Sequence, residues 1–469
     1  MSDERLLARA AELAREHLSS LPDRHVGPTA TLPELRASLG HPLTDDGVDA
    51  PQVLGDLVAG AQGGLVATPG PRYFGFVIGG ALPVALAADW IVSAWDQNGG
   101  GWPASPAAAV IEEVAAGWVR ELLRLPSGAS VGFVTGGQMA NFTALAAARH
   151  EVLRRAGWDV EAKGLQGAPA VRVLVGDEAH VTIFTALRLL GLGRERAERV
   201  PLDERGRMRA DALREALERG GAGPAIVCAQ AGNVDSGAVD PLGEVATVAR
   251  EHGAWCHVDG AFGLWAAASP RLAPLLAGHE LADSWATDAH KWLNVPYDCG
   301  VVAVADPAPH RAAMTMSAAY LPVEDSDQRW GFDWAPEMSR RARGIPVYAA
   351  LRFLGRSGVA ELVERCCELA TRMAARLDSE PGIEVVNDVV LNQVLVRIGD
   401  EDRATEEVVR LVQEDGTCWL GGTTWQGRGA MRISVSNWST READADRSVD
   451  SILEAARAVL AGAPGARGG

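Results

Sequence analysis

The sequence predicts an α/β fold whose central sheet is mostly parallel and is covered by helices on both faces. Short, continuously apolar and β-branched runs recur along the chain, and helical stretches separate them. Strands buried on both faces have this unbroken apolar character, and helices are the usual connections between parallel strands. The 469 residues exceed what one simple core holds, so we expect more than one subdomain.

Residues 1–95 are expected to form an N-terminal helical arm. The chain begins MSDERLLARAAELAREHL, which is charged, has a helical period and contains no apolar signal core. The next helix is predicted in SPAAAVIEEVAAGWVRELL. Ser105 is a favourable N-cap there, and Pro106 is a favourable first helical residue.

Residues 96–345 are expected to form the large domain that contains the sheet. Apolar runs predict strands at 171–175, 225–229, 254–258 and 300–305. Helical patterns such as DALREALERG and PLGEVATVAREHG lie between them. Near the end of this range, the charged loop LPVEDSDQRWGFDWAP is expected to be mobile or to contact a partner.

Residues 346–469 are expected to form a smaller α+β domain. The helical stretch VAELVERCCELATRMAARL comes first, and the short strand-like runs EVVNDVV, QVLVRI and AMRISVS follow it. We find no internal repeat that would favour a solenoid or another repetitive fold.

The charge and cysteine content limit the classes of partner. A net charge of -17 argues against binding to nucleic acid or to an anionic membrane. The longest uncharged run, 125–148, contains glycines and amides and is a poor membrane span. The 6 cysteines form no C-x-x-C pair and no zinc spacing, so we expect no metal site and a reducing, cytoplasmic location.

Polar residues follow several of the predicted strands. Ligands bind at the carboxyl ends of strands in open parallel sheets, so these residues are candidates for one site. The candidates at strand ends are Gly136, Gly137, Gln138, His180, Asn233, Asp259, Asp288, His290 and Lys291.

Each candidate also has an ordinary explanation when taken alone. The glycine pair 136–137 could form a tight turn, and Asp259 could cap a helix. His180 could be a structural histidine, and Lys291 could lie in a surface turn. His257 beside Asp259 could suggest a metal site, but no further ligand has suitable spacing.

Taken together, the candidates match the needs of pyridoxal phosphate. This cofactor requires a lysine amine for a Schiff base and an anion site for its phosphate, which the helix start after the glycine pair would provide. It also requires a carboxylate that favours the protonated ring nitrogen. Lys291, the glycine pair and Asp259 supply these three elements.

Two motifs, HVDGAFGLW and SWATDAHKWLNVPYDCG, closely resemble the group II pyridoxal-phosphate decarboxylases of fold type I. This family includes aromatic-amino-acid, glutamate and histidine decarboxylases. The similarity extends through GFVTGGQMANFTAL, GDEAHVTIFTALRLLGLG and AGNVDSGAVDP and covers about residues 65–365. It implies a seven-stranded central sheet, pyridoxal phosphate as the cofactor, and a homodimer whose active sites are built from both chains.

The resemblance also implies residue roles. Lys291 corresponds to the Schiff-base lysine, Asp259 to the partner of the ring nitrogen, and His180 to a stacking histidine and candidate proton donor. The other implied cofactor contacts are Gly136, Gly137, Gln138, Asn233, Ala261, Asp288 and His290. The implied substrate pocket contains Phe76, Val77 and Trp102, with Trp330 or Phe332 from a loop at 322–333.

Three positions depart from the family pattern. Relatives of the aromatic-decarboxylase type carry a loop tyrosine that returns a proton to the substrate. Matching Trp334 and the Arg340–Arg341 pair places Gly331 at that tyrosine position, and the loop contains no tyrosine. An acid, Asp288, stands where a polar phosphate contact is usual, and Gln138 stands where a small hydroxyl residue is usual.

These observations leave three hypotheses. The first is an L-amino-acid decarboxylase, with an aromatic or other bulky substrate. The second keeps the cofactor but forms an aldehyde by oxidative deamination, or transfers the amino group, with Arg432 as a possible carboxylate ligand. The third is a non-catalytic binding or scaffold homologue, which the presence of Lys291, Asp259 and His180 makes the weakest.

Overall fold

The computed structural model describes residues 2–221, 223–316 and 328–462. It contains two compact units. The larger unit comprises residues 79–371 and 387–394, and the smaller one is formed from described residues within 1–78, 372–386 and 395–469. The division at residues 95 and 345 therefore stays a prediction, because the N-terminal helices and the C-terminal segments share one unit.

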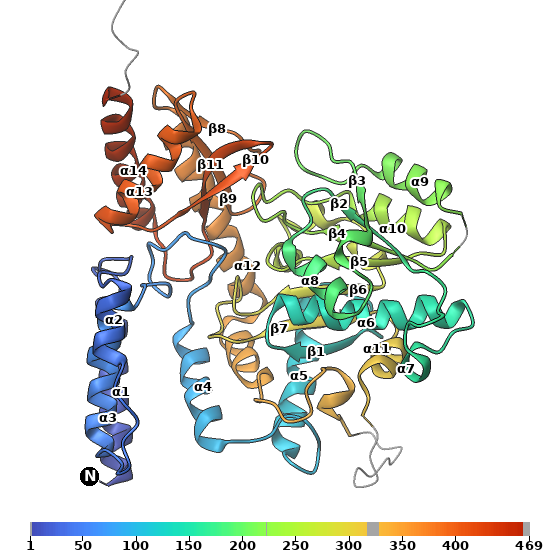
Figure 1. Cartoon of the computed structure of the whole chain (residues 1–469), viewed down its shortest axis with the longest axis horizontal. Coiled ribbons are helices and arrows are strands. Elements are labelled where there is room, and N and C mark those ends of the chain that lie inside the picture. The colour runs from blue at the N-terminus through green and yellow to red at the C-terminus, as the bar shows by residue number, and fades with distance from the viewer. Residues whose placement is uncertain (1, 222, 317–327, 463–469) are drawn as a thin grey trace, which may run out of the picture. The chain divides into compact units, whose positions relative to one another are not determined.

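The larger unit is built on a seven-stranded sheet in the order β1-β7-β6-β5-β4-β2-β3. Only β7 runs antiparallel to its two neighbours, so the expected mostly parallel sheet is confirmed (Figure 1). The strands are β1 Ser130–Val134, β2 Arg172–Gly176, β3 Ala197–Val200, β4 Ala225–Gln230, β5 Trp255–Asp259, β6 Ser284–Asp288 and β7 Gly300–Val304.

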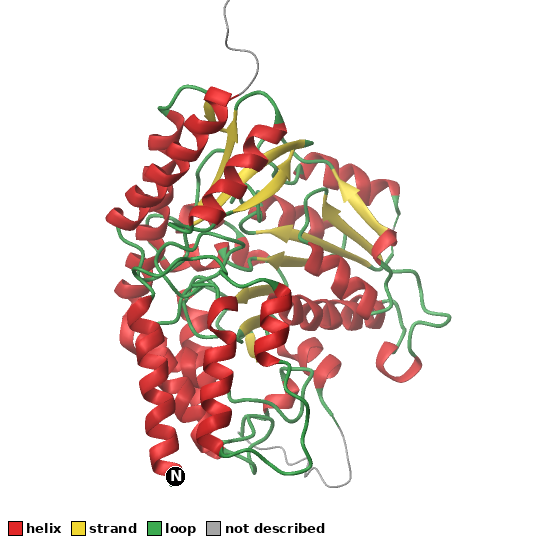
Figure 2. Ribbon diagram, turned by 60° about the vertical axis from the view of Figure 1, so that its left-hand side comes forward, coloured by secondary structure: helices red, strands yellow, loops and turns green. Residues whose placement is uncertain are grey.

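Helices cover both faces of this sheet (Figure 2). The connection from β2 to β3 runs along the sheet in one direction, and the connections from β3 to β4 and from β4 to β5 run in the other. Because such crossovers are right-handed, α8 lies on one face of the sheet and α9 and α10 lie on the other. The helices are α4 Pro83–Trp95, α5 Pro106–Leu122, α6 Gly137–Arg155, α7 Val160–Lys163, α8 Val181–Leu189, α9 Ala210–Arg219, α10 Leu242–Glu251 and α11 Pro307–Met314.

Helix α6 is the central helix on its face, because it packs against β5, β6 and β7 and also against α8 and α11. It is rich in alanine, and most of its residues are buried. Small side chains allow a helix to approach a sheet closely, and this closeness brings polar residues of α6 into contact with those of β5.

Helix α12, Gly344–Asp378, continues from the larger unit into the smaller one along the chain. It is interrupted at Gly355, whose φ of 60° and ψ of -176° are not helical. The conformation suits glycine, which has no Cβ to clash at positive φ.

The smaller unit combines three N-terminal helices with a four-stranded sheet in the order β10-β11-β9-β8. Helix α13 packs against β10, β11 and α14. The elements are α1 Asp3–Ser20, α2 Leu32–Leu39, α3 Ala50–Ala61, β8 Ile383–Val385, β9 Gln393–Ile398, α13 Asp402–Asp415, β10 Gly421–Trp425, β11 Arg428–Ser434 and α14 Glu442–Gly462.

Candidate active site

The sheet brings the predicted site residues of the larger unit to one edge. Asp259 ends β5 and Asp288 ends β6, and these two strands are parallel neighbours in which Asp259 lies opposite Ala286. His180 follows β2, and the glycine pair 136–137 follows β1 at the start of α6. All of these strands point their carboxyl ends to the same edge, as expected for an open α/β sheet.

Lys291 lies in a firmly held turn between β6 and β7. Asn294 adopts a left-handed conformation with φ 56°. Its side-chain oxygen accepts a hydrogen bond from Gly80 N at 2.6 Å, and its carbonyl accepts one from Leu82 N at 2.8 Å. A Cβ on Gly79 would overlap the carbonyl of Lys291, so the backbones pass in direct contact. This turn is part of the packed interior and not an ordinary surface turn.

The amine of Lys291 points into the polar cluster. Its side chain is 21% exposed, and Nζ lies 3.0 Å from Oδ2 of Asp288. The Asp288 side chain is almost fully buried, at 2% exposure. A buried carboxylate is stabilised by a paired cation, so Asp288 holds the lysine amine within the site.

Asp259 is a buried carboxylate at the centre of the cluster. Its Oδ1 accepts a hydrogen bond from Ala261 N at 3.2 Å, and its Oδ2 accepts one from Asn141 Nδ2 at 3.0 Å. Burial raises the pKa of Asp259, and the neighbouring His180 and Lys291 side chains oppose that rise. A further cation beside this carboxylate would therefore be stabilised.

His180 caps the N-terminus of α8. Its Nδ1 lies 2.8 Å from the hydroxyl of Thr182 and 3.4 Å from the backbone N of the same residue. This geometry fixes the orientation of the imidazole.

The start of α6 lies against the carboxylate of Asp288. Gly136 is extended, and a Cβ on Gly137 would lie 2.7 Å from Asp288 Oδ2. Oδ1 of Asp288 has no hydrogen-bond partner among the described residues, although His290 Nε2 lies 3.5 Å away. Burial lowers the pKa of His290, while Asp288 acts in the opposite direction. An acid thus occupies the anion-binding start of the helix.

These residues fit pyridoxal phosphate at two of its three contact points. Lys291 offers an amine, and Asp259 offers a buried carboxylate that would hold a protonated ring nitrogen. The third contact point would be the start of α6, where backbone N–H groups favour an anion but Asp288 lies against Gly137. Asp288 is the residue that fits less well, because its charge would repel the phosphate.

Two other proposed cofactor contacts differ in their surroundings. Asn233 is buried and donates to Glu178 Oε2 at 3.1 Å, and its Oδ1 accepts hydrogen bonds from Asp235 N and Ser236 N. The amide of Asn233 therefore stabilises its own turn. Gln138 is exposed on the first turn of α6.

The proposed substrate residues belong to both units. Phe76 and Val77 are in the smaller unit, where Phe76 is 61% exposed and stacks on Trp419 with 5.6 Å between ring centroids. Trp102 and Phe332 are in the larger unit, and Phe332 is buried against Trp330. Residues 322–327 of the proposed loop lie outside the described residues, and the substrate assignment stays a prediction.

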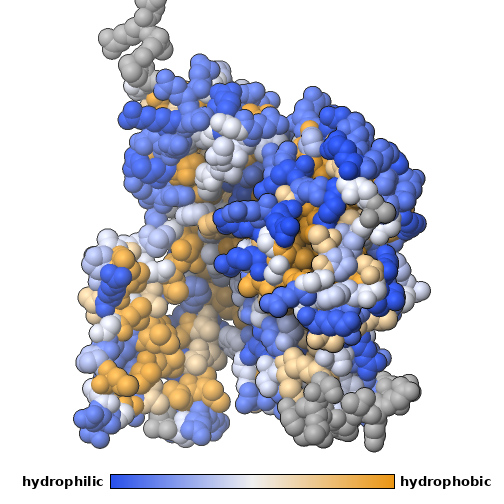
Figure 3. Space-filling view, turned by 45° about the vertical axis from the view of Figure 1, so that its right-hand side comes forward, coloured by the Kyte–Doolittle hydropathy of each residue, from blue (hydrophilic) through white to orange (hydrophobic). Residues whose placement is uncertain are grey.

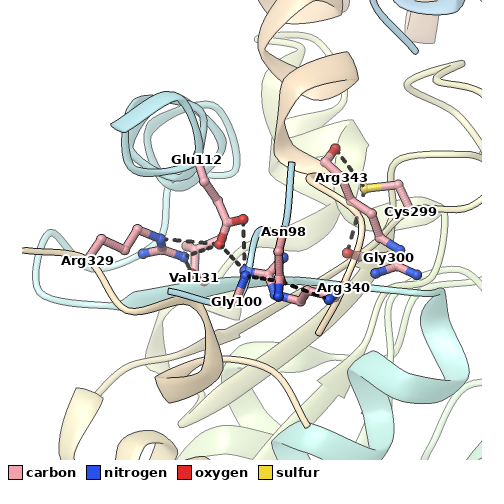
Figure 4. A network of polar contacts seen from close by, with 9 residues as sticks. All are labelled: Asn98, Gly100, Glu112, Val131, Cys299, Gly300, Arg329, Arg340 and Arg343. Carbon is pink, nitrogen blue, oxygen red and sulfur yellow. Dashed lines mark hydrogen bonds and ion pairs between the residues drawn. The ribbon is translucent and has the colours of Figure 1, made fainter. Parts of the chain in front are cut away.

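Gly331, the residue matched to the family's loop tyrosine, lies in a buried 3-10 turn, Gly331–Asp333. A Cβ at this position would overlap the carbonyl of Gly99 and the guanidinium of Arg340. Arg340 in turn binds Glu112, which also binds Arg329 (Figure 4). No side chain, and certainly no tyrosine, fits at residue 331 in this arrangement.

The sequence reasoning did not identify Asn141, Thr182 or Ser284 as part of this cluster, and it weighed His257 only as a metal ligand. His257 hydrogen-bonds to Ser284 and Asn141 at 2.9 Å each. Within the part of the chain that the structure describes, no cluster of three or more His, Cys, Asp or Glu side chains could hold a metal ion. The alternation of Trp255, His257 and Asp259 along β5 was the available signal, because alternate residues share one face of a strand.

A seven-stranded α/β sheet with a lysine beside buried carboxylates at its carboxyl edge defines the class of enzymes that bind a carbonyl cofactor through a lysine. The sequence also matches the pyridoxal-dependent decarboxylase conserved domain over residues 34–398. The chain belongs to this pyridoxal-dependent decarboxylase family. It is an enzyme of the carboxy-lyase class, acts on an amino acid and uses pyridoxal phosphate.

Individual relatives agree with this assignment. The chain is 28% identical to an aromatic-L-amino-acid decarboxylase of Bacillus atrophaeus, covering 87% of this chain and 84% of the relative. It is 31% identical to an L-2,4-diaminobutyrate decarboxylase of Rhizobium meliloti, covering 80% and 76%. It is 26% identical to a phenylacetaldehyde synthase of Arabidopsis thaliana, covering 90% and 88%. Among solved structures, Oryza sativa TDC with PLP and tryptamine superposes with a TM-score of 0.90 at 26% identity, covering 97% and 98%.

Proposed function

We propose that the chain decarboxylates an L-amino acid with Lys291 as the covalent anchor of pyridoxal phosphate. The position of Lys291 carries this proposal: its amine lies 3.0 Å from buried Asp288, in the same cluster as Asp259. The chain contains only one other lysine, Lys163, which is exposed and lies over the ring of Trp158. Lys291 is thus the one lysine with a buried acidic neighbourhood.

Each residue of the cluster has a distinct task in this proposal. Pyridoxal phosphate, when bound, supplies the electron sink for cleavage of the bond between Cα and the carboxylate. With the cofactor bound, Asp259 would favour a protonated ring nitrogen, and Ala261 would contribute only a small side chain to the site. His180 would contact the cofactor and would be the candidate proton donor. Lys291 would hold the cofactor covalently, and Asp288 would pair with its amine when that amine is not bonded to the cofactor.

A second outcome, formation of an aldehyde with release of ammonia and peroxide, is favoured by one observation. The position matched to the family's loop tyrosine is Gly331, which has no room for a side chain. Without that donor, the proton returns to Cα more slowly, and O₂ has more time to react. An aldehyde synthase is among the relatives of the chain, so both outcomes occur in proteins of this similarity.

The identity of the anchor can be tested chemically. The enzyme loaded with pyridoxal phosphate should absorb visible light, and borohydride reduction should attach the cofactor permanently to one lysine. We expect mass spectrometry to find the label on Lys291. Lys291→Ala should lose the absorbance, whereas Lys163→Ala should keep it. Label on Lys163, or an unchanged spectrum for Lys291→Ala, would contradict the proposal.

The reaction outcome requires four products to be measured together: CO2, amine, ammonia and peroxide. A panel of aromatic, acidic and basic L-amino acids should be assayed, because the relatives include aromatic and diaminobutyrate decarboxylases. We expect the largest activity with a bulky or aromatic substrate. An amount of amine equal to that of CO2 would support simple decarboxylation. An amount of peroxide equal to that of CO2 would contradict it and support the oxidative reaction.

We also propose that the chain acts as a cytoplasmic homodimer. Large apolar side chains are exposed on the N-terminal segment of the smaller unit, which the space-filling view shows as apolar surface (Figure 3). Exposed apolar patches of this kind are typical of protein interfaces. They include Leu7 at 71%, Leu32 at 58%, Leu43 at 103% and Leu57 at 57%. Light scattering after size exclusion should give twice the chain mass of 49.4 kDa.

The described residues give two further observations. No described helix is both long and apolar enough to span a membrane. All 6 cysteines lie within the described residues, are buried and form no disulfide, which is consistent with a reducing compartment.

A further inference from the structure

Next to the proposed cofactor site, β5 carries three side chains with hydrogen-bonding groups on one of its faces. Trp255, His257 and Asp259 alternate along the strand and are all buried. Helix α6 packs against this strand, and its Asn141 has no solvent exposure. Ser284, the first residue of β6, is also fully buried. Hydrogen bonds join these residues into a chain that continues to Thr182 and His180.

The direction of each hydrogen bond follows from groups that can only donate or only accept. Trp255 Nε1 is a donor and lies 2.8 Å from Ser284 Oγ. At the other end, the Asp259 carboxylate accepts from Asn141 Nδ2. The amide oxygen of Asn141 must therefore face His257 Nε2, which lies 2.9 Å away and has to carry a proton.

The state of His257 completes this half of the chain. Burial lowers the pKa of His257 to about 3, so the ring is neutral and carries one proton. Because that proton is on Nε2, Nδ1 must accept a hydrogen bond. Ser284 Oγ, 2.9 Å away, supplies it while accepting from Trp255. Every donor between Trp255 and Asp259 thus has one acceptor.

The second amide hydrogen of Asn141 continues the chain to His180. Asn141 Nδ2 donates to Thr182 Oγ1 at 3.1 Å. The hydroxyl of Thr182 lies 2.8 Å from His180 Nδ1, and the backbone N–H of Thr182 also points to this nitrogen at 3.4 Å. Both groups donate, so His180 Nδ1 accepts and the proton of the neutral ring is placed on Nε2.

We propose that Asn141 is a positioning residue that sets the proton arrangement of both Asp259 and His180. One N–H of its amide holds the carboxylate of Asp259, and the other, through Thr182, keeps the His180 proton on Nε2. The inference rests on the proposed function in one respect: the Nε2–H of His180 faces the substrate only if the cofactor lies where that function places it.

An asparagine is required at this point for a stereochemical reason. An aspartate would present no hydrogen to Asp259 and would place two carboxylates within hydrogen-bond distance. A leucine would remove the acceptor for the Nε2–H of His257 and the donor to Oδ2 of Asp259. Only a group with one acceptor and two donors satisfies all three neighbours.

The test compares two deletions of a buried hydroxyl. Thr182→Val removes the hydroxyl that donates to His180 Nδ1 at 2.8 Å and leaves only the longer backbone contact at 3.4 Å. Thr143→Val, in α6, removes a hydroxyl with no hydrogen-bond partner in the described part of the chain. The two changes have the same shape and the same loss of one oxygen. Thr182→Ser keeps the hydroxyl and serves as the rescue variant.

Solid-state 15N NMR of histidine-labelled enzyme shows which ring nitrogen carries the proton, both without cofactor and after loading with pyridoxal phosphate. The chain has 10 histidines, and a difference spectrum with His180→Gln assigns the signal. We expect His180 to be protonated only on Nε2 in the unaltered enzyme, in Thr182→Ser and in Thr143→Val. Thr182→Val should show both tautomers. Protonation on Nδ1 in the unaltered enzyme, or no change in Thr182→Val, would overturn the proposal.

A second measurement tests the contact with Asp259. Asn141→Leu should weaken the affinity for pyridoxal phosphate at least tenfold in an absorbance titration, whereas Thr182→Val should change it less than twofold. Equal affinities for the three proteins would overturn the role assigned to Asn141. The tautomer of His180 does not depend on the reaction catalysed, so failure of the proposed function would appear in the lysine-labelling experiment and leave the NMR result unchanged.

Discussion

Two buried polar networks of the larger unit are built in opposite ways. The network beneath the proposed cofactor site, from Trp255 to His180, consists of directed hydrogen bonds around one buried carboxylate, Asp259. The network around Glu112 is ionic, because two guanidinium groups, Arg329 and Arg340, share one carboxylate (Figure 4).

The difference shows what each type of network can do. A directed chain places single protons on chosen atoms, which is what a reaction site needs. An ion cluster fixes backbone: Arg340 N binds Asn98 Oδ1, and Phe332 N binds Gly100 O, so the turn beside Gly331 is held in place. The first network can serve chemistry and the second can serve structure, and four substitutions or conditions test that distinction.

The largest effect is expected for Asp259→Asn in the directed network. The amide still accepts a hydrogen bond, so the fold should be retained, but it no longer stabilises a protonated ring nitrogen. We expect kcat for CO2 release to fall about a thousandfold, or roughly 4 kcal/mol in activation free energy. Circular dichroism should be unchanged. Full turnover by this variant would show that the carboxylate is not the partner of the ring.

Glu112→Gln should lower the free energy of unfolding and leave the catalytic rate nearly unchanged. It leaves two buried guanidinium groups without a counter-charge, and breaking a buried pair in this way costs about 3 kcal/mol. Urea unfolding should show this loss, while kcat per folded molecule changes less than twofold. The matched control is Glu113→Gln, which alters the adjacent but exposed residue. A normal stability for Glu112→Gln would mean that the ion cluster does not fix the turn.

Acid should destabilise the surroundings of both networks through two buried histidines: His257 of the directed network, and His310, which hydrogen-bonds to Ser130 and lies near Arg329. Burial lowers the pKa of His257 and of His310 to about 3 each. In the unfolded chain, a histidine binds a proton below about pH 6.5. The unfolded state therefore binds more protons between these two pH values. The contribution of each buried histidine to the free energy of unfolding is fully present above about pH 6.5 and decreases as the pH is lowered.

The expected slope is about 1.4 kcal/mol per pH unit for each histidine. Unfolding free energies at pH 7, 6 and 5 should show it. His257→Gln and His310→Gln should each remove one such contribution. Equal slopes in the unaltered protein and both variants would contradict the buried neutral state of both histidines.

Glu112 adds an effect at lower pH with a different cause. Burial alone would raise its pKa, but Arg340 and Arg329 hold the pKa of this carboxyl below its usual value. The stabilisation is present above about pH 4.3, the range in which an unfolded glutamate is ionised. It is lost as the pH falls through the folded pKa, so the ionic network fails only after the histidines have begun to titrate.

The sequence predicted the parts of this molecule that depend on local pattern. Apolar runs located β2, β4, β5 and β7, and strand ends located Asp259 and Lys291. The edge strand β3 was missed because AERV has no apolar run, and β10 was missed because GGTTW is rich in glycine.

Contacts between distant segments were less accessible to sequence reasoning. Asn141 and Asp259 are 118 residues apart, and Glu112 and Arg340 are 228 apart. Their pairing depends on how closely α6 and α5 approach the sheet, and nothing in a single sequence measures that distance. The same limit applies to Gly331, since the absence of a tyrosine was readable but the absence of space was not.

The smallest effect is expected for Asp288→Asn, a change beside the start of α6 and next to the directed network. Asp288 is a charged residue within the otherwise directed site, and its Oδ2 lies 2.7 Å from the Cβ position of Gly137. If this charge opposes the cofactor phosphate, the asparagine variant should bind pyridoxal phosphate about fivefold more tightly, roughly 1 kcal/mol. Pyridoxal, which has no phosphate, should gain nothing. An equal gain or an equal loss for both compounds would show that Asp288 acts through its ion pair with Lys291 and not on the phosphate.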